Sequence, residues 1–148
     1  MLHSANRRFS IQFELHRLSA QAHSGWISYS LTLRTQNDAF ALVSTADEPL
    51  FLDCEVEPEI PAFCCGIRSV IERGGTYCFE PIDDRDFAFL ITVDDSSCII
   101  KITMADKPIP ARFGWSSGAR VEAPDLLRFA DELEANYASL LQRNDHDD

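Results

Sequence analysis

Apolar residues occupy every second position in four stretches of the first half of the chain. In residues 9–15, for example, apolar side chains alternate with serine, glutamine and glutamate. A period of two is typical of a strand with one buried face. Turn residues separate the stretches, which together predict an antiparallel meander of about four strands. The four stretches are residues 9–15, 27–33, 39–45 and 50–56.

The hydrophobic period then changes. Apolar residues recur every three or four positions, which predicts a helix over about residues 60–73 with one packed face. Pro61 suits the first turn of this helix, and Gly74 ends it. Gly66 lowers the helix propensity in the middle but allows a close approach to a sheet.

A second run of strands and a second helix follow. The chain then alternates in residues 76–82, 87–93 and 98–104, more weakly in 111–121, and shows helical spacing in 124–142. This order predicts an α+β fold, a curved antiparallel sheet of about eight strands in two runs with two helices packed on it. We expect one domain over residues 1–143 and a disordered acidic tail at residues 144–148.

The five cysteines, an odd number, lie in apolar or strand-like segments. Their spacing contains no C-x-x-C, and the first ten residues lack the apolar run of a signal peptide. We therefore expect reduced, mostly buried thiols in a cytoplasmic protein, with no metal or other cofactor. Cys64 and Cys65 are interpreted as packing residues, because neighbouring helix positions point about 100° apart. The cysteines are Cys54, Cys64, Cys65, Cys78 and Cys98.

The chain of 148 residues is acidic, with a net charge of −11 at pH 7. Its first 46 residues hold four basic and two acidic residues, so the negative excess lies in the remaining 102. Such a chain repels phosphate backbones, which disfavours nucleic-acid binding, and no apolar stretch approaches the length of about 18 residues that spans a membrane. The negative charge would attract a basic protein partner, or it serves solubility alone.

A row of carboxylates between residues 47 and 59 is the strongest polar pattern. Asp53, Glu55 and Glu57 alternate with apolar residues, so an extended chain would present them on one face. We interpret the row as a docking stripe for a basic protein, and the alternative is the solvated side of an edge strand. The candidate partner-binding residues are Asp47, Glu48, Asp53, Glu55, Glu57 and Glu59 in this row, with Asp83, Asp84 and Asp86 in a second cluster.

The second cluster has two interpretations. Three nearby carboxylates offer oxygen ligands for calcium or magnesium. The glycine and the terminal glutamate of an EF-hand loop are missing, and an aspartate-rich turn explains these residues more simply. The cluster therefore serves as a second candidate contact surface rather than as a metal site.

Sequence motifs for catalysis are missing. The chain has no G-x-S-x-G, residues 114–118 lack the lysine of a P-loop, and three of the four histidines lie within the first 23 residues. A carboxylate pair for glycoside hydrolysis stays open, because the separation of such a pair is spatial. We expect a protein that acts by binding and is not an enzyme.

About 90 residues at the C-terminal end resemble a family of bacterial immunity proteins. The segment VEAPDLLRFADELEANY places Asp125, Leu126, Phe129 and Leu133 at the DL-x-x-F-x-x-x-L spacing of a closing amphipathic helix. With the preceding helix and hairpin, it is similar to immunity proteins of polymorphic toxin systems, in particular the family that accompanies wall-associated nuclease toxins. The resemblance implies a strand-rich body that acts by binding. The N-terminal hairpin and the cysteines depart from that family.

The leading hypothesis is a cytoplasmic immunity or inhibitor protein that neutralises a cognate bacterial toxin by stoichiometric binding. Charge-steered docking would be followed by occlusion of a basic active-site cleft, such as that of a nuclease. Two alternatives stay open. One is a small ligand-binding domain or enzyme with a pocket in the sheet, and the other is an acidic scaffold or regulatory subunit.

Overall fold

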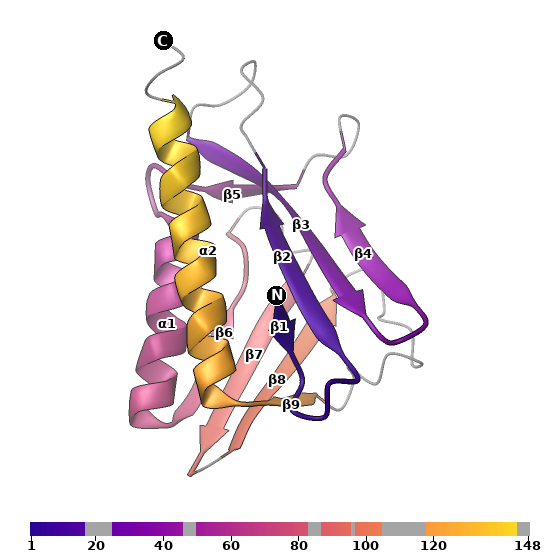
Figure 1. Ribbon diagram of the computed structural model, residues 1–148. Helices are drawn as coiled ribbons and strands as arrows, with labels where there is room; N and C mark the ends of the chain where they lie inside the picture. Colours follow the sequence, from indigo (N-terminus) through magenta and orange to yellow (C-terminus); the bar gives the residue numbers. More distant parts are fainter. Residues whose placement is uncertain (17–24, 46–49, 83–86, 96, 105–117, 145–148) are drawn as a thin grey trace.

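The structure is a computed structural model that describes residues 1–16, 25–45, 50–82, 87–95, 97–104 and 118–144. Within these ranges, two antiparallel sheets and two helices form an α+β fold, as predicted (Figure 1). The first sheet contains β1 (Leu2–His3), β2 (Ser10–Leu15), β3 (Trp26–Arg34), β4 (Ala39–Val43) and β5 (Phe51–Asp53). The second contains β6 (Gly75–Phe79), β7 (Phe87–Asp94), β8 (Ser97–Met104) and β9 (Ala119–Val121).

The long strand β3 organises the first sheet. One edge of β3 pairs with β2, and the other edge pairs first with β5 and then with β4. Every second side chain of β3 is buried, from Ile27 to Leu33, which confirms the predicted period of two. Pairing with β3 thus fixes the position of β5, and the candidate site described below starts at the end of β5.

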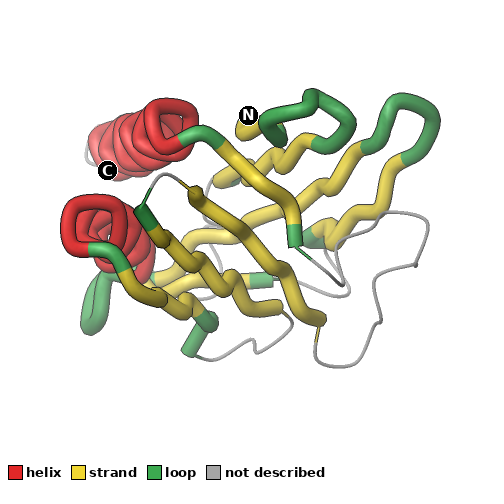
Figure 2. Tube along the Cα trace, turned by 90° about the horizontal axis from the view of Figure 1, so that it is seen from below, coloured by secondary structure: helices red, strands yellow, loops and turns green. Residues whose placement is uncertain are grey.

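Aromatic rings fill the space between the two sheets. The ring of Phe13 on β2 lies 5.5 Å from that of Tyr29 and 6.0 Å from that of Phe87 on the second sheet. The ring of Phe63, from the first helix, lies 5.2 Å from that of Phe89. Seen from below, the sheets form two layers, and both helices lie along the same side of them (Figure 2). Burial of these large apolar surfaces stabilises the layered arrangement.

The two helices, α1 (Glu59–Arg73) and α2 (Ala123–Asn144), run side by side (Figures 1 and 2). Leu133 of α2 is only 2% exposed, as its position in the apolar stripe predicts. At the solvent side of the contact, the guanidinium of Arg68 pairs with the carboxylates of Asp131 at 2.8 Å and Glu134 at 2.6 Å. These carboxylates raise the pKa of Arg68 above its ordinary value. The two helices therefore pack together as one unit beside the sheets.

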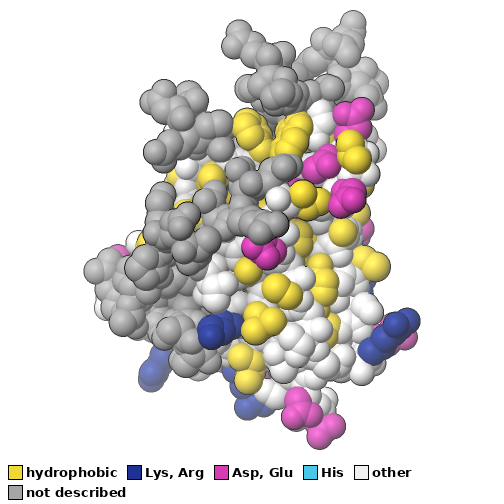
Figure 3. All heavy atoms as spheres, turned by 180° about the vertical axis from the view of Figure 1, so that it is seen from behind, with side chains coloured by type: hydrophobic (Ala, Val, Ile, Leu, Met, Phe, Trp, Pro, Cys, Tyr) yellow, Lys and Arg dark blue, Asp and Glu magenta, His cyan; other side chains and the backbone are white. Residues whose placement is uncertain are grey.

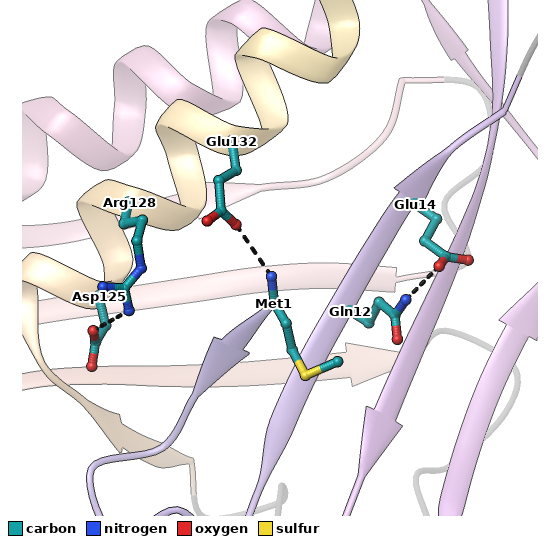
Figure 4. A network of polar contacts seen from close by, with 6 residues as sticks. All are labelled: Met1, Gln12, Glu14, Asp125, Arg128 and Glu132. Carbon is teal, nitrogen blue, oxygen red and sulfur yellow. Dashed lines mark hydrogen bonds and ion pairs between the residues drawn. The ribbon is translucent and has the colours of Figure 1, made fainter.

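The N-terminal segment joins three parts of the fold. β1 pairs with β2, and the amino group of Met1 lies 3.3 Å from the carboxylate of Glu132 on α2 (Figure 4). The backbone N–H of Ala5 donates to the carbonyl of Arg120 on β9 at 2.8 Å. One end of the first sheet is thereby tied to the second sheet and to α2.

The structure corrects several predicted boundaries. The strands form two sheets instead of one curved sheet, and β1 was not predicted. The strand expected over residues 50–56 ends at Asp53. The weak strand expected over residues 111–121 is seen only at its end, as β9. Residues 105–117 lie outside the described ranges. Asn144 belongs to α2, and the rest of the expected tail also falls outside them.

All five cysteines are free thiols, but their burial is uneven. Cys64 and Cys98 are buried, and burial raises the pKa of the Cys64 thiol to about 11 and that of the Cys98 thiol above its usual range. Cys65 and Cys78 are exposed, so the expectation of mostly buried thiols was wrong for them. Cys65 is rotated away from the packed face of α1, and Cys78 lies on the outer face of β6.

No helix within the described ranges is both long enough and apolar enough to span a membrane.

Candidate protein-binding site

The expected acidic row bends instead of continuing as a strand. The carboxylate of Asp53 accepts hydrogen bonds from the backbone N–H groups of Glu55 at 2.9 Å, Val56 at 3.1 Å and Glu57 at 3.1 Å. These bonds, led by that from Glu55, hold the pKa of the Asp53 carboxyl below its ordinary value. A side chain that satisfies the following backbone donors competes with a strand ladder. The flat three-carboxylate face predicted for residues 53–57 is therefore not formed.

Glu59 has a structural position rather than a docking position. Its side chain is 4% exposed although it begins α1. Its carboxylate accepts hydrogen bonds from the backbone N–H of Asp53 at 2.6 Å and from that of Ile82 at 2.7 Å. The side chain thus ties the end of β5 to the segment after β6, and its burial contradicts the expectation of a surface contact.

The remaining candidate carboxylates fall into two groups. Glu55 and Glu57 are exposed, as a docking residue requires. The others lie outside the residues that the structure describes, namely Asp47, Glu48, Asp83, Asp84 and Asp86.

A groove with a volume of about 310 Å³ opens beside the bend, between the start of α1 and the end of β6. Its lining combines carboxylates with apolar surface and one thiol. We call this cavity the α1–β6 groove. It is lined by Glu57, Pro58, Glu59, Ala62, Cys78, Phe79, Glu80 and Ile82.

Close packing between α1 and β6 forms the groove wall. A Cβ atom on Gly66 would lie 2.1 Å from Cζ of Tyr77, so only glycine leaves room for this ring. The Tyr77 hydroxyl donates to the carbonyl of Ala62 at 3.4 Å, and burial raises the pKa of Tyr77 to about 12. The close approach predicted for Gly66 is confirmed, and it packs α1 closely against β6.

The outer face of the second sheet continues from the groove. Antiparallel register places Cys78 of β6, Leu90 of β7 and Lys101 of β8 in one row. Leu90 is 36% exposed, and Ile99 in the next row is 42% exposed. Seen from behind, hydrophobic side chains gather among uncharged atoms on this face, and acidic side chains lie toward its upper and lower ends (Figure 3). We call the uncharged part of this outer face the uncharged sheet face, and Lys101 on β8 borders it; the uncharged part comprises Thr76, Cys78, Ala88, Leu90, Thr92 and Ile99.

A second hollow, of about 440 Å³, lies between β2 and α2. β2 contributes Glu14 and the adjoining residue His16, while α2 contributes Asn136 and Arg143. The His16 Nε2 atom lies 2.8 Å from the hydroxyl of Ser30. The alternative hypothesis required a pocket in the sheet, whereas this hollow is lined by one strand of the first sheet together with α2.

Neither cavity has the features of a metal site. Among the described residues, no group of three or more histidine, cysteine, aspartate or glutamate side chains is arranged to hold a metal ion.

Comparison of the chain with protein-family models, with curated proteins and with solved structures finds no match.

Sequence reasoning missed six residues of the groove: Pro58, Ala62, Cys78, Phe79, Glu80 and Ile82. Pro58 follows Glu57 in the chain, whereas the other five looked like ordinary helix or strand residues that only the packing of α1 against β6 brings to Glu57. The single usable signal was Glu80, an acidic residue that continues the outer positions of a strand.

Proposed function

We propose that the protein is an immunity or inhibitor protein that binds a basic bacterial toxin and covers its active site. The observation that supports this proposal is the continuity of an apolar, uncharged sheet face with an acid-lined groove. Protein interfaces combine a core poor in charge with a polar rim. Leu90 and Ile99 would lie in the core, and Glu55, Glu57 and Glu80 at the rim.

The net charge of the protein favours a basic partner. A net charge of −11 favours encounter with a positively charged protein and accelerates association at low ionic strength. A toxin that cleaves nucleic acid needs a basic cleft for the phosphate backbone, and an acidic protein competes for that cleft. The inhibitor then needs stoichiometric binding and no chemistry of its own.

The direct test is coexpression with the toxin domain encoded beside the gene. We expect the protein to rescue growth and to form a complex of fixed stoichiometry whose association rate falls as salt is added. A neighbouring gene without a toxin domain, or growth inhibition that persists in the presence of the protein, would contradict the proposal.

The contact surface is tested with one matched pair of variants. Leu90→Asp places a charge in the uncharged sheet face, and Ala41→Asp places the same charge on exposed β4 of the first sheet. We expect Leu90→Asp to weaken toxin binding by about tenfold or more, because a carboxylate at an interface core must be desolvated. Ala41→Asp should bind as the parent protein does. Equal affinities for the two variants would exclude this face as the contact.

A second candidate function is supported by the hollow between β2 and α2. Glu14 can bind a cation, while Arg143 and His16 can donate to an anion, so the hollow suits a small zwitterion such as an amino acid. An NMR screen with free amino acids tests it. Shifts at His16 and Asn136 that disappear in Arg143→Ala would support this function, and their absence would exclude it.

A further inference from the structure

We infer that the α1–β6 groove binds one long cationic side chain, a lysine or an arginine, that the basic partner presents. This inference rests on the proposed function and names the anchor contact within it. A cavity of about 310 Å³ lies at the lower end of the usual range for ligand sites, about 300–1,000 Å³. That size suits a single side chain better than a helix or a strand.

The apolar part of the groove fits an aliphatic stem. Ala62 from α1 and Ile82 from the segment after β6 both line the groove, and Ile82 is 47% exposed. Lysine and arginine cover apolar surface with their methylene groups while the charged end reaches a polar partner. An inserted stem would therefore remove the exposed surface of Ile82 from water.

The polar part of the groove fits the charged end. Glu57 and Glu80 are exposed carboxylates on the two sides, one in the bend before α1 and one after β6. Glu59 also lines the groove, but its carboxylate is buried and already accepts from the N–H groups of Asp53 and Ile82, so it contributes negative charge rather than a surface contact. A guanidinium or an ammonium donates several hydrogen bonds and accepts none, so it matches a lining of carboxylates.

The surrounding surface explains why one side chain would act as an anchor. Binding energy concentrates in a few residues that fill pockets and are shielded from water by neighbouring contacts. The groove shares Cys78 with the uncharged sheet face, so a partner seated on that face would cover the mouth of the groove. The inserted cation would then be desolvated beside its carboxylates, where truncation has large effects.

The first test uses a small probe without any toxin. N-acetyl-arginine methylamide is titrated into the labelled protein, and N-acetyl-citrulline methylamide, its uncharged isostere, is the control ligand. We expect the amide signals of Ala62, Cys78 and Ile82 to shift with the arginine probe and not with the citrulline probe. Equal shifts with both ligands, or none with either, would overturn the inference.

A pair of volume variants separates the groove from its surroundings. Ala62→Leu fills the groove without changing the charge, and Cys65→Leu makes a similar addition at an exposed position of α1 outside the groove. Ala62→Leu should abolish the probe shifts and raise the dissociation rate of the toxin complex about tenfold or more. Cys65→Leu should leave both measurements unchanged. Binding that survives Ala62→Leu would contradict insertion.

A pair of charge variants separates the anchor from long-range steering. Glu80→Gln removes a groove carboxylate, and Glu55→Gln removes an exposed carboxylate of the same bend that does not line the groove. Glu80→Gln should mainly raise the dissociation rate, whereas Glu55→Gln should mainly lower the association rate and its dependence on salt. If both variants had the same effect, the groove carboxylate would contribute only long-range steering, and the inference of an anchoring side chain would be overturned.

Failure of the inference is distinguishable from failure of the proposed function. A toxin that binds normally to Ala62→Leu and Glu80→Gln would overturn the anchor and leave the inhibitor function in place. A protein that binds the arginine probe selectively but no toxin would overturn the inhibitor function and retain a cation-selective groove.

Discussion

Glu59 carries more of the local structure than its place in an acidic stretch suggests. Its carboxylate joins two segments that are 29 residues apart in the sequence, because Asp53 and Ile82 both donate to it. A partly buried N–H that loses its partner costs about 1–3 kcal/mol. At the residue scale, this side chain holds the walls of the α1–β6 groove in place.

Replacement of Glu59 is therefore expected to destabilise the fold. Glu59→Ala leaves both N–H groups without this acceptor, and we expect a loss of about 2–4 kcal/mol in the free energy of unfolding. Urea denaturation at pH 7 measures it. Glu57→Ala, which removes an exposed carboxylate two residues earlier, should change the same quantity by less than about 0.5 kcal/mol. Equal losses would show that Glu59 is not a structural link.

Asp53 makes the bend dependent on pH. Its lowered pKa means that the unfolded chain binds more protons than the folded chain between the folded value and the ordinary value of 3.8. The stabilising contribution of Asp53 is thus complete above the ordinary value and is lost as the pH falls through the folded value. We expect Asp53→Ala to be less stable than the parent at pH 7 and equally stable in strong acid. Carbon-13 NMR titration checks the sign, and a midpoint at or above 3.8 would contradict it.

At the element scale, the contact of α1 with β6 depends on one missing side chain. Gly66 is a poor helix residue, and alanine would favour the helix by about 1 kcal/mol. The ring of Tyr77 occupies the space that a methyl group would need. Packing here outweighs helix propensity.

The double-mutant cycle of Gly66→Ala with Tyr77→Ala measures this balance. Gly66→Ala alone should destabilise the protein by about 1–2 kcal/mol, because overpacking costs more than helix propensity returns. In a Tyr77→Ala background the same change should stabilise the protein by up to about 1 kcal/mol. The same sign in both backgrounds would show that the ring does not determine the effect.

The sequence predicted elements best where one face is buried throughout. β3 and α2 are long, and most of their periodic apolar positions are buried, although Leu141 near the end of α2 is 36% exposed, so hydrophobic period alone located them. The predicted strand over residues 50–56 was too long because the Asp53 carboxylate accepts hydrogen bonds from the N–H groups that follow it. The spacing of apolar residues carries no information about such a side-chain bond. β1 spans two residues, which is too short for any period.

The candidate site was harder to predict than the fold. Exposed carboxylates at Glu55 and Glu57 were visible in the sequence, but the groove arises from the packing of α1 against β6. The burial of Glu59 could not be foreseen, since its two donors, Asp53 and Ile82, lie 29 residues apart in the sequence. A sequence pattern describes residues that are close along the chain, whereas the residues of this site come from separate segments that are brought together by folding.

At the scale of the whole molecule, one core joins both sheets and both helices, so its thiols report on different kinds of opening. Cys65 and Cys78 should react with a thiol reagent in the native protein at rates close to those in the unfolded chain. Cys64 and Cys98 should react only after global unfolding, because both are buried and their pKa values are raised.

Mass spectrometry of the native protein after a short pulse of iodoacetamide checks this order. Cys65→Ser and Cys78→Ser assign the two fast sites. Rapid labelling of Cys64 would show that α1 separates from α2 in the native state.

The attachment of the N-terminal segment has a consequence for biosynthesis. Residues 1–5 are synthesised more than a hundred positions before Arg120 and Glu132, the residues that they contact in the folded protein. Sequence-distant contacts form late because the chain entropy of a long loop must be lost first. While translation proceeds, the nascent first sheet lacks the second sheet and α2 that cover it, and its apolar face is open to aggregation. Slow synthesis at low temperature should therefore raise the soluble yield less than coexpression of a chaperone that holds nascent chains.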